Sequence, residues 1–208
     1  MGRGVTQAPD AGPPDCAAVV IGGSAGALDV LRKILQHLPV TLDVPVIVVI
    51  HLSARPPDGL PELLGRDCAV PVKQAEDKEP LLAGMVYVAP AGYHLLIESH
   101  RALALSIDPP VHFSRPSIDV LFESARDTYG GRLLAILLSG ASIDGAAGMH
   151  EIHAAGGTTI VQSPASAEAI AMPAAALSLF EPAFVWTPDE MASQLPALLG
   201  SAAAARHS

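Results

Sequence analysis

Residues 17–29 read AAVVIGGSAGALD, and this stretch decides the fold class of the chain. Its β-branched apolar run predicts a buried strand, which stops at the segment GGSAG, residues 22–26. From Leu28 to Leu38, apolar residues recur at helical spacing, which predicts a helix after the turn. Ser24 therefore places one hydroxyl on a glycine-flanked turn between a strand and a helix. Turns of this kind hold a nucleophile in some α/β proteins and a phosphate group in others.

Strand and helix patterns alternate along most of the sequence that follows. Further strands are expected at 45–53, 132–140, 157–163 and 183–186, and helices at 58–66, 116–130, 144–156, 173–179 and from 187 onward. Short runs separated by turn signals over 70–106 indicate antiparallel hairpins. Near-continuous apolar strands that alternate with helices predict an α/β fold: a doubly wound, mostly parallel sheet with helices on both faces and a short antiparallel hairpin extension. We expect a flexible tail over 1–16, one domain over 17–200 and a second tail over 201–208.

The composition narrows the class of protein and of partner. The chain has 208 residues, of which 50% are apolar and 16% charged, as expected for one globular domain. Its formal net charge of −9, with no run of Lys and Arg, argues against nucleic acid as a partner. No apolar run is long enough to span a membrane or to form a secretory signal, so we expect no membrane insertion. Two cysteines, Cys16 and Cys68, are too few for a disulfide framework or a cysteine-based zinc site, and they fit a cytoplasmic location.

Reactive side chains follow three of the predicted parallel strands. Ser24 follows the first strand, His51 follows the second, and Asp144 follows the strand at 132–140. Function collects at the carboxyl ends of the strands in open α/β sheets, so we expect these side chains to lie at one edge of the sheet. A serine hydroxyl needs a base to become a nucleophile, histidine can take and return its proton, and a carboxylate can orient the imidazole. The set therefore predicts nucleophilic catalysis.

Each of these residues also has a purely structural interpretation. A Ser or Asp that precedes a helix is commonly its N-cap, and a His at a strand end is commonly only hydrogen-bonded in place. The remaining histidines are expected mostly on the surface: His37, His94, His100, His112, His150 and His153. The last two lie three residues apart on one predicted helix, but no third ligand pattern accompanies them, so we predict no metal site there.

A phosphate-binding turn is the main alternative for residues 22–26. The dinucleotide pattern G-x-G-x-x-G needs glycine where this chain has Ser24 and Ala27. The acid expected about 20 residues further on would be Asp43, which stands before the second strand, whereas His51 stands at its end. The segment matches G-x-S-x-G instead, although the order Ser, His, Asp differs from that of α/β-hydrolases. These features favour a nucleophile.

Several longer segments resemble the catalytic domain of the CheB family of bacterial chemotaxis methylesterases. They are VVIGGSAGALDVL, VIVVIHLS, VKQAEDKEPLLAGMVYVAPAGYHLLI, SRPSIDVLFESAR, ILLSGASIDGAAGM and GGTTIVQSPASAEAIAMPAAAL, in family order. The resemblance implies Ser24 as nucleophile, His51 as base and Asp144 as the third member of the triad. It also implies hydrolysis of γ-glutamyl methyl esters on the cytoplasmic helices of chemoreceptors, release of methanol, deamidation of receptor glutamines, and no cofactor.

The resemblance and the chemistry of ester hydrolysis also nominate supporting residues. Backbone N–H groups of Ala25, Gly26 and Ala141 are expected to stabilise the oxyanion. The R-P-S segment lines the site in the family, which nominates Arg115 and Ser117.

The chain departs from the family pattern in three places. Ala27 replaces a glycine after the nucleophile, and Ser142 replaces a glycine that would be strained as serine if its φ were positive. The residues before R-P-S read HFS (112–114), where the family usually has N-x-H. The family's methylesterases also usually carry an N-terminal receiver domain, for which the expected tail has no room, so we expect a stand-alone member or an excised piece, with a separate response regulator as partner. Two alternatives stay open: a non-catalytic interaction module with the same fold, and nucleotide binding at the first turn.

Overall fold

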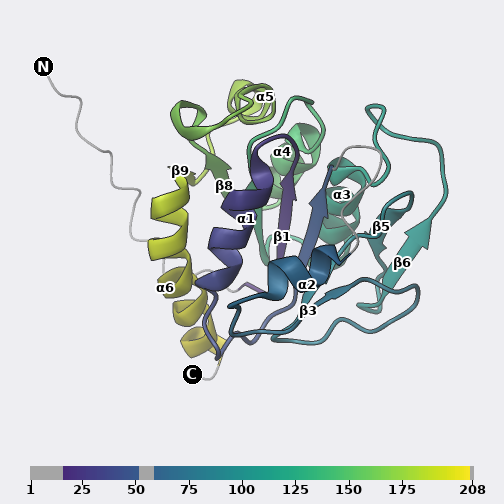
Figure 1. Cartoon of the computed structure of the whole chain (residues 1–208), viewed down its shortest axis with the longest axis vertical. Coiled ribbons are helices and arrows are strands. Elements are labelled where there is room, and N and C mark those ends of the chain that lie inside the picture. The colour runs from purple at the N-terminus through teal and green to yellow at the C-terminus, as the bar shows by residue number, and fades with distance from the viewer. Residues whose placement is uncertain (1–15, 52–58, 207–208) are drawn as a thin grey trace, which may run out of the picture.

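The computed structural model describes residues 16–51 and 59–206, and a seven-stranded sheet forms the centre of this part of the chain (Figure 1). The strand order is β3-β4-β2-β1-β7-β8-β9, and every neighbouring pair is parallel. The strands are β1 (Ala18–Gly23), β2 (Val46–Ile50), β3 (Val72–Gln74), β4 (Val86–Val88), β7 (Leu133–Leu137), β8 (Thr158–Gln162) and β9 (Phe184–Trp186). The four longest are almost entirely buried, and β2 and β7 consist only of Val, Ile, Leu and Ala, because both faces of the sheet are covered.

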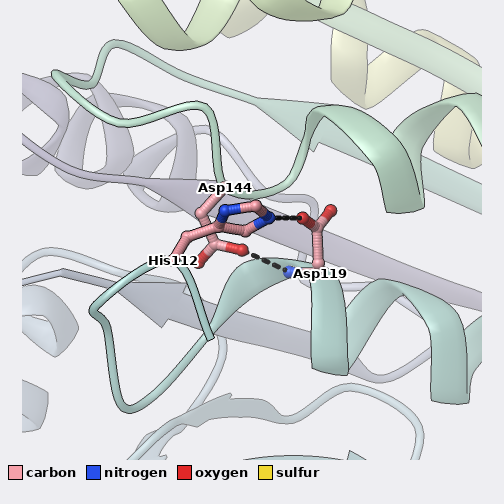
Figure 2. A group of neighbouring side chains, drawn as sticks. All are labelled: His112, Asp119 and Asp144. Atoms are coloured by element: carbon pink, nitrogen blue, oxygen red, sulfur yellow. Dashed lines mark hydrogen bonds and ion pairs between the residues drawn. The ribbon is translucent and has the colours of Figure 1, made fainter. Parts of the chain in front are cut away.

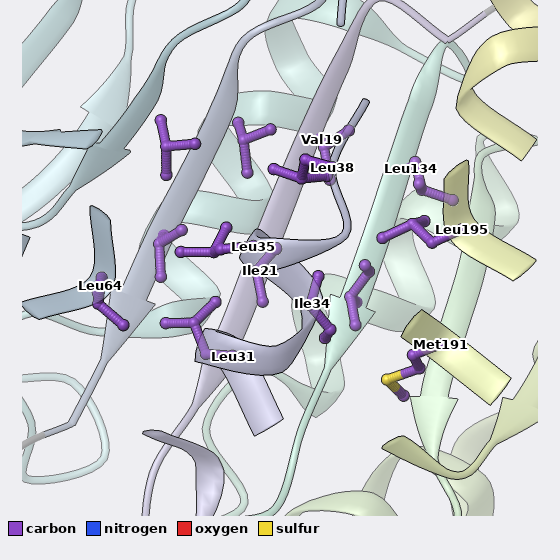
Figure 3. Close-up of a cluster of buried hydrophobic side chains, with 14 of the residues drawn as sticks. Val19, Ile21, Leu31, Ile34, Leu35, Leu38, Leu64, Leu134, Met191 and Leu195 are labelled. Atoms are coloured by element: carbon purple, nitrogen blue, oxygen red, sulfur yellow. The ribbon is translucent and has the colours of Figure 1, made fainter. Parts of the chain in front are cut away.

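Helices cover both faces, as Figure 1 shows. One layer holds α1 (Ala27–Gln36), α2 (Leu60–Gly65) and α6 (Pro188–Arg206), and the other holds α3 (Ile118–Tyr129), α4 (Ala146–Ala154) and α5 (Ala171–Leu179). Successive strand residues point to opposite faces, so Val19 and Ile21 join the first core with α1 and α6 (Figure 3), whereas Ala18 and Val20 join the second core with α3. The predicted α/β fold with helices on both faces is therefore confirmed.

The expectation of antiparallel hairpins over all of 70–106 is wrong for its first half. Strands β3 and β4 join the main sheet as parallel strands beside β2. Only β5 (His94–Ile97) and β6 (Leu103–Ser106) pair antiparallel, in a separate two-stranded sheet whose buried leucines pack with α3. Strands β3 and β4 are each only three residues long. Their residue patterns are too short to indicate which strand of the sheet each one pairs with.

The structure describes one residue of the expected N-terminal tail and most of the expected C-terminal tail. The predicted tail over 1–16 lies outside the described residues except for Cys16, which is buried. The predicted tail over 201–208 overlaps α6, which continues to Arg206. Among the described residues, no helix is both long and apolar enough to cross a membrane.

The topology places a switch point beside β1. The loop after β1 leads to α1 in one helix layer, and the loop after β7 leads to α4 in the other. Strands β1 and β7 are neighbours, so two loops that diverge to opposite faces begin side by side at the carboxyl edge of the sheet. Ligand sites form at such switch points in open α/β sheets.

Candidate active site

The strand register brings Ser24 and His51 next to each other. Gly23, the last residue of β1, pairs with Ile50, the last residue of β2, and the N–H of His51 donates to the Gly23 carbonyl at 2.9 Å. Ser24 and His51 are therefore the first residues beyond adjacent parallel strands. Among the described residues, the Ser24 hydroxyl makes no hydrogen bond, so it neither caps α1 nor contacts His51 as a hydrogen-bond partner. The hydrogen bond between a catalytic serine and its base is often long or poorly aligned when no substrate is bound.

The turn that carries Ser24 leaves backbone donors free. The N-cap of α1 is Gly26, with φ of 75°, and no side chain caps this helix. Within the described residues, the N–H groups of Ala25, Gly26 and Ala141 donate no hydrogen bond. A Cβ on Gly26 would lie 2.4 Å from Glu168 Cβ, so both its conformation and its surroundings require glycine. The turn can thus direct free N–H groups at an anion.

Ser139, which follows β7, holds this turn in place and was not nominated from the sequence. Its carbonyl accepts the Ser24 N–H at 2.9 Å, and its buried hydroxyl donates to the Ala25 carbonyl at 2.7 Å. Its own N–H donates to Gln162 Oε1 at 2.8 Å. The only signal in the sequence was a polar residue at the end of an apolar strand.

Asp144 caps the N-terminus of α3, a helix that comes before it in the sequence. Its fully buried carboxylate accepts the N–H of Ile118 at 2.8 Å, the N–H of Asp119 at 3.0 Å and the Ser117 hydroxyl at 2.8 Å, all from the first turn of α3. The simple capping interpretation placed Asp144 on α4, but the N-cap of α4 is Gly145, with no side-chain cap. A carboxylate is favoured at a helix N-terminus, where backbone N–H groups and the helix dipole stabilise negative charge.

The environment of Asp144 keeps it ionised. Burial alone raises the pKa of Asp144, but the contact with His51 and the hydrogen bonds from α3 outweigh burial and hold the pKa below its ordinary value. His51 Nε2 lies 2.9 Å from Asp144 Oδ2, within ion-pair distance, although the ring is not turned into straight hydrogen-bond geometry. The other ring nitrogen, Nδ1, lies 3.4 Å from the Ser114 hydroxyl. Nδ1 is therefore the nitrogen left to act as a base.

A second His–Asp pair, His112 and Asp119, lies beside Asp144 (Figure 2). His112 Nε2 is 3.4 Å from Asp119 Oδ2, and Asp119 Oδ1 accepts the N–H of Gly148 in α4 at 2.7 Å. The two helices thus cap each other, because Asp144 binds the start of α3 and Asp119 binds the start of α4. Burial raises the pKa of Asp119 to about 6; the Gly148 hydrogen bond opposes this shift and the Asp144 charge adds to it.

His112, Asp119 and Asp144 together carry side-chain atoms of the kinds that bind metal ions. Donor atoms of His112, Asp119 and Asp144 all lie within 4.8 Å of one another. The Asp144 oxygens, however, already accept three hydrogen bonds and face His51. The arrangement is accounted for by helix capping and by the two ion pairs.

The structure separates the two residues nominated from the R-P-S segment. Ser117 is buried, caps α3 by accepting the N–H of Val120 at 3.4 Å, and donates to Asp144. Arg115 is exposed, and its guanidinium donates to the carbonyls of Ile107 and Asp108 at 2.8 and 3.0 Å. Arg115 therefore anchors the neighbouring loop, whereas Ser117 contacts the site directly.

The expectation that the other histidines are mostly superficial is wrong for His94. His94 is 1% exposed; its Nδ1 accepts the Ser117 N–H at 3.2 Å and its Nε2 donates to the Pro109 carbonyl at 3.1 Å. His94 therefore helps to hold the N-cap of α3. His150 and His153 pack their rings near Phe180, with centroid distances of 5.8 and 4.8 Å.

Comparison with known proteins gives the family. The CheB methylesterase family model matches residues 19–195. This chain belongs to the CheB methylesterase family. A putative protein-glutamate methylesterase/protein-glutamine glutaminase of Leptospira interrogans is 42% identical over 175 residues, which cover 84% of this chain and 91% of the relative. Protein-glutamate methylesterase/protein-glutamine glutaminase 2 of Methanospirillum hungatei is 38% identical over 184 residues, which cover 88% of this chain and 53% of that longer relative.

A solved structure agrees with the family assignment. The CheB methylesterase catalytic domain of Thermotoga maritima matches with a TM-score of 0.80 at 28% identity, covering 89% of this chain and 98% of that domain. The match extends over nearly the whole domain, so the switch point described above belongs to a CheB-type fold.

Two departures from the CheB pattern are accommodated locally. Ala27 is the first residue of α1 and is fully buried. Ser142 is not among the described residues with positive φ, so the strain anticipated for a serine there is absent. Its hydroxyl instead accepts the N–H of Asp144 at 3.1 Å. With both residues in place, Asp144 still accepts hydrogen bonds from Ser117, Ile118 and Asp119.

Proposed function

We propose that this chain is a serine esterase that hydrolyses γ-glutamyl methyl esters on chemoreceptor helices and releases methanol. Ser24 is the nucleophile, His51 the base and Asp144 the orienting carboxylate. The observation that carries the proposal is the buried Asp144 carboxylate, 2.9 Å from the His51 ring, beside the strand end that carries Ser24. The names of both relatives, protein-glutamate methylesterase/protein-glutamine glutaminase, support this ester and, as a second reaction, deamidation of receptor glutamines.

The proposed reaction proceeds through an acyl-enzyme. Ser24 Oγ adds to the ester carbonyl carbon while His51 Nδ1 takes its proton, and Asp144 stabilises the imidazolium that forms. The N–H groups of Ala25, Gly26 and Ala141 stabilise the oxyanion. The carbon–oxygen bond to the methoxy group then breaks, and His51 returns the proton so that methanol leaves. Water, activated by His51, releases the glutamate carboxylate and restores Ser24.

The proposed setting is the cytoplasm, where the esterified receptor helices would meet the enzyme. This proposal includes no membrane insertion and no nucleic-acid partner, in keeping with the net charge of −9. A separate response regulator stays a prediction; adding it in its phosphorylated and unphosphorylated forms should change the rate if it is a controlling partner.

The test is methanol release from a methylated cytoplasmic receptor fragment. We expect the wild-type chain to release methanol and Ser24→Ala to release none, with an unchanged circular dichroism spectrum. Retained activity in Ser24→Ala would refute the assignment of the nucleophile. Failure of the folded wild-type protein to release methanol would refute the esterase and favour a non-catalytic interaction module.

A further inference from the structure

Three exposed apolar side chains belong to loops that contact the site. Phe113 is fully exposed at 102%, Ile143 is 57% exposed and Ile170 is 58% exposed. They lie on three different loops, and we call them the apolar rim. Burying apolar surface is favourable, so a partner surface that covers these three side chains would gain binding free energy.

Phe113 and Ile143 are each one position from a residue of the site, and Ile170 is connected to the site through Ser139. Phe113 precedes Ser114, whose hydroxyl is 3.4 Å from His51 Nδ1. Ile143 directly precedes Asp144. Ile170 follows Ala169, whose N–H donates to the Ser139 hydroxyl at 2.9 Å, and the Ser139 carbonyl accepts the Ser24 N–H. The three loops that carry the rim residues therefore meet the site at which a substrate has to arrive.

The loop that presents Phe113 is held in an unusual backbone conformation. Val111 and Ser114 pair through two main-chain hydrogen bonds of 3.1 and 2.9 Å, and the two residues between them, His112 and Phe113, have φ of 47° and 62°. Turns with positive φ at both central positions favour Asn and Gly, and a bulky aromatic residue is rare there. The His112–Asp119 ion pair anchors the turn at 3.4 Å. Strain of this kind, stabilised by surrounding contacts, is typical of functional sites.

We propose that the apolar rim, with Phe113 as its main anchor, docks the helix face of the protein substrate that presents the esterified glutamate. The proposal rests on the proposed function for the identity of the ester. A helix fits better than an extended segment because Ser24 follows β1, the central strand, whereas the sheet edges β3 and β9 lie at the far ends. Residues three or four positions from the ester on that helix share its face, so their apolar side chains can meet the rim.

Binding is measured first, so that the test does not depend on catalysis. The affinity of a methylated receptor cytoplasmic fragment is compared between Ser24→Ala and Ser24→Ala carrying Phe113→Asn, because Asn tolerates the positive φ. We expect Phe113→Asn to weaken binding about ten- to a hundredfold, the range given by burying one large apolar side chain. Phe113→Leu should retain most of the affinity. Val40→Asn is the matched control, since Val40 is 77% exposed in the turn after α1, at the opposite edge of the sheet.

Kinetics on active protein separate docking from chemistry. Phe113→Asn should raise KM for the receptor fragment while hydrolysis of p-nitrophenyl acetate stays within about twofold of wild type, because a small ester does not reach the rim. Unchanged binding, or equal losses on both substrates, would overturn the docking proposal. A dimer that Phe113→Asn dissociates without changing fragment affinity would assign the rim to a second copy and also overturn it. A wild-type protein that binds the fragment through Phe113 but releases no methanol would refute the esterase alone.

Discussion

Replacing Asp144 by Asn tests the helix-capped carboxylate directly. The carboxylate accepts two backbone N–H groups and one hydroxyl with its two oxygens, and Oδ2 also faces His51. An amide keeps only one oxygen. Its NH₂ group faces either the Ile118 N–H or the Ser117 hydroxyl and the Asp119 N–H, so at least one buried donor loses its acceptor. A buried donor left unsatisfied costs about 1–3 kcal/mol, and bonds to a charged group are the stronger ones. We expect the free energy of unfolding to fall by about 2–4 kcal/mol.

The same change removes the charge that stabilises the His51 imidazolium. Loss of the triad carboxylate typically lowers kcat by roughly 10³–10⁴-fold, which is about 4–6 kcal/mol of transition-state stabilisation. Methanol release gives kcat and urea unfolding gives stability, both at pH 7.5. Asp119→Asn is the matched control, because Asp119 is also buried at a helix N-terminus but pairs with His112. We expect it to keep kcat within about threefold. A kcat for Asp144→Asn within tenfold of wild type, or equal losses in both variants, would refute the reasoning.

Three further outcomes follow from the geometry. Gly26→Ala should lower stability by about 1–3 kcal/mol and reduce activity, because φ is 75° and the new Cβ would meet Glu168 Cβ at 2.4 Å; wild-type unfolding and rates would contradict this. Ser114→Ala should keep at least about a tenth of kcat, since its 3.4 Å contact to His51 is a weak one, and complete loss of methanol release would show that Ser114 is essential. Burial raises the pKa of Asp119 to about 6, so the folded protein holds a proton that the unfolded chain releases near pH 4. From pH 4 to 7 the wild type should therefore lose on the order of 2 kcal/mol of stability relative to Asp119→Asn, and parallel pH profiles in urea unfolding would contradict the buried acid.

The main sheet could be predicted because its long strands are buried on both faces. Strands such as β1 and β2 are unbroken apolar runs, and parallel strands place their carboxyl ends at one edge. This argument alone predicts that Ser24, His51 and Asp144 lie near one another. It needs no knowledge of side-chain contacts.

The partners of those residues could not be predicted, because they are tertiary. Asp144 looks in sequence like a cap for the helix that follows it, yet it binds α3, which precedes it by 26 residues at Ile118. The burial of His94 depends on how the β5-β6 hairpin packs with α3, and no local pattern specifies this. The roles of these residues depend on where α3 begins in space relative to α4.

The most direct test of the central claim is the identity of the serine that reacts. Among the described residues, two serines stand beside His51: Ser24 follows the adjacent strand, and the Ser114 hydroxyl lies 3.4 Å from Nδ1. Labelling with a fluorophosphonate probe, followed by peptide mass spectrometry, identifies the nucleophile. We expect modification of Ser24 in the wild-type protein and its loss in His51→Ala. Labelling at Ser114, or no labelling of the folded wild-type protein, would contradict the assignment of Ser24 as the nucleophile.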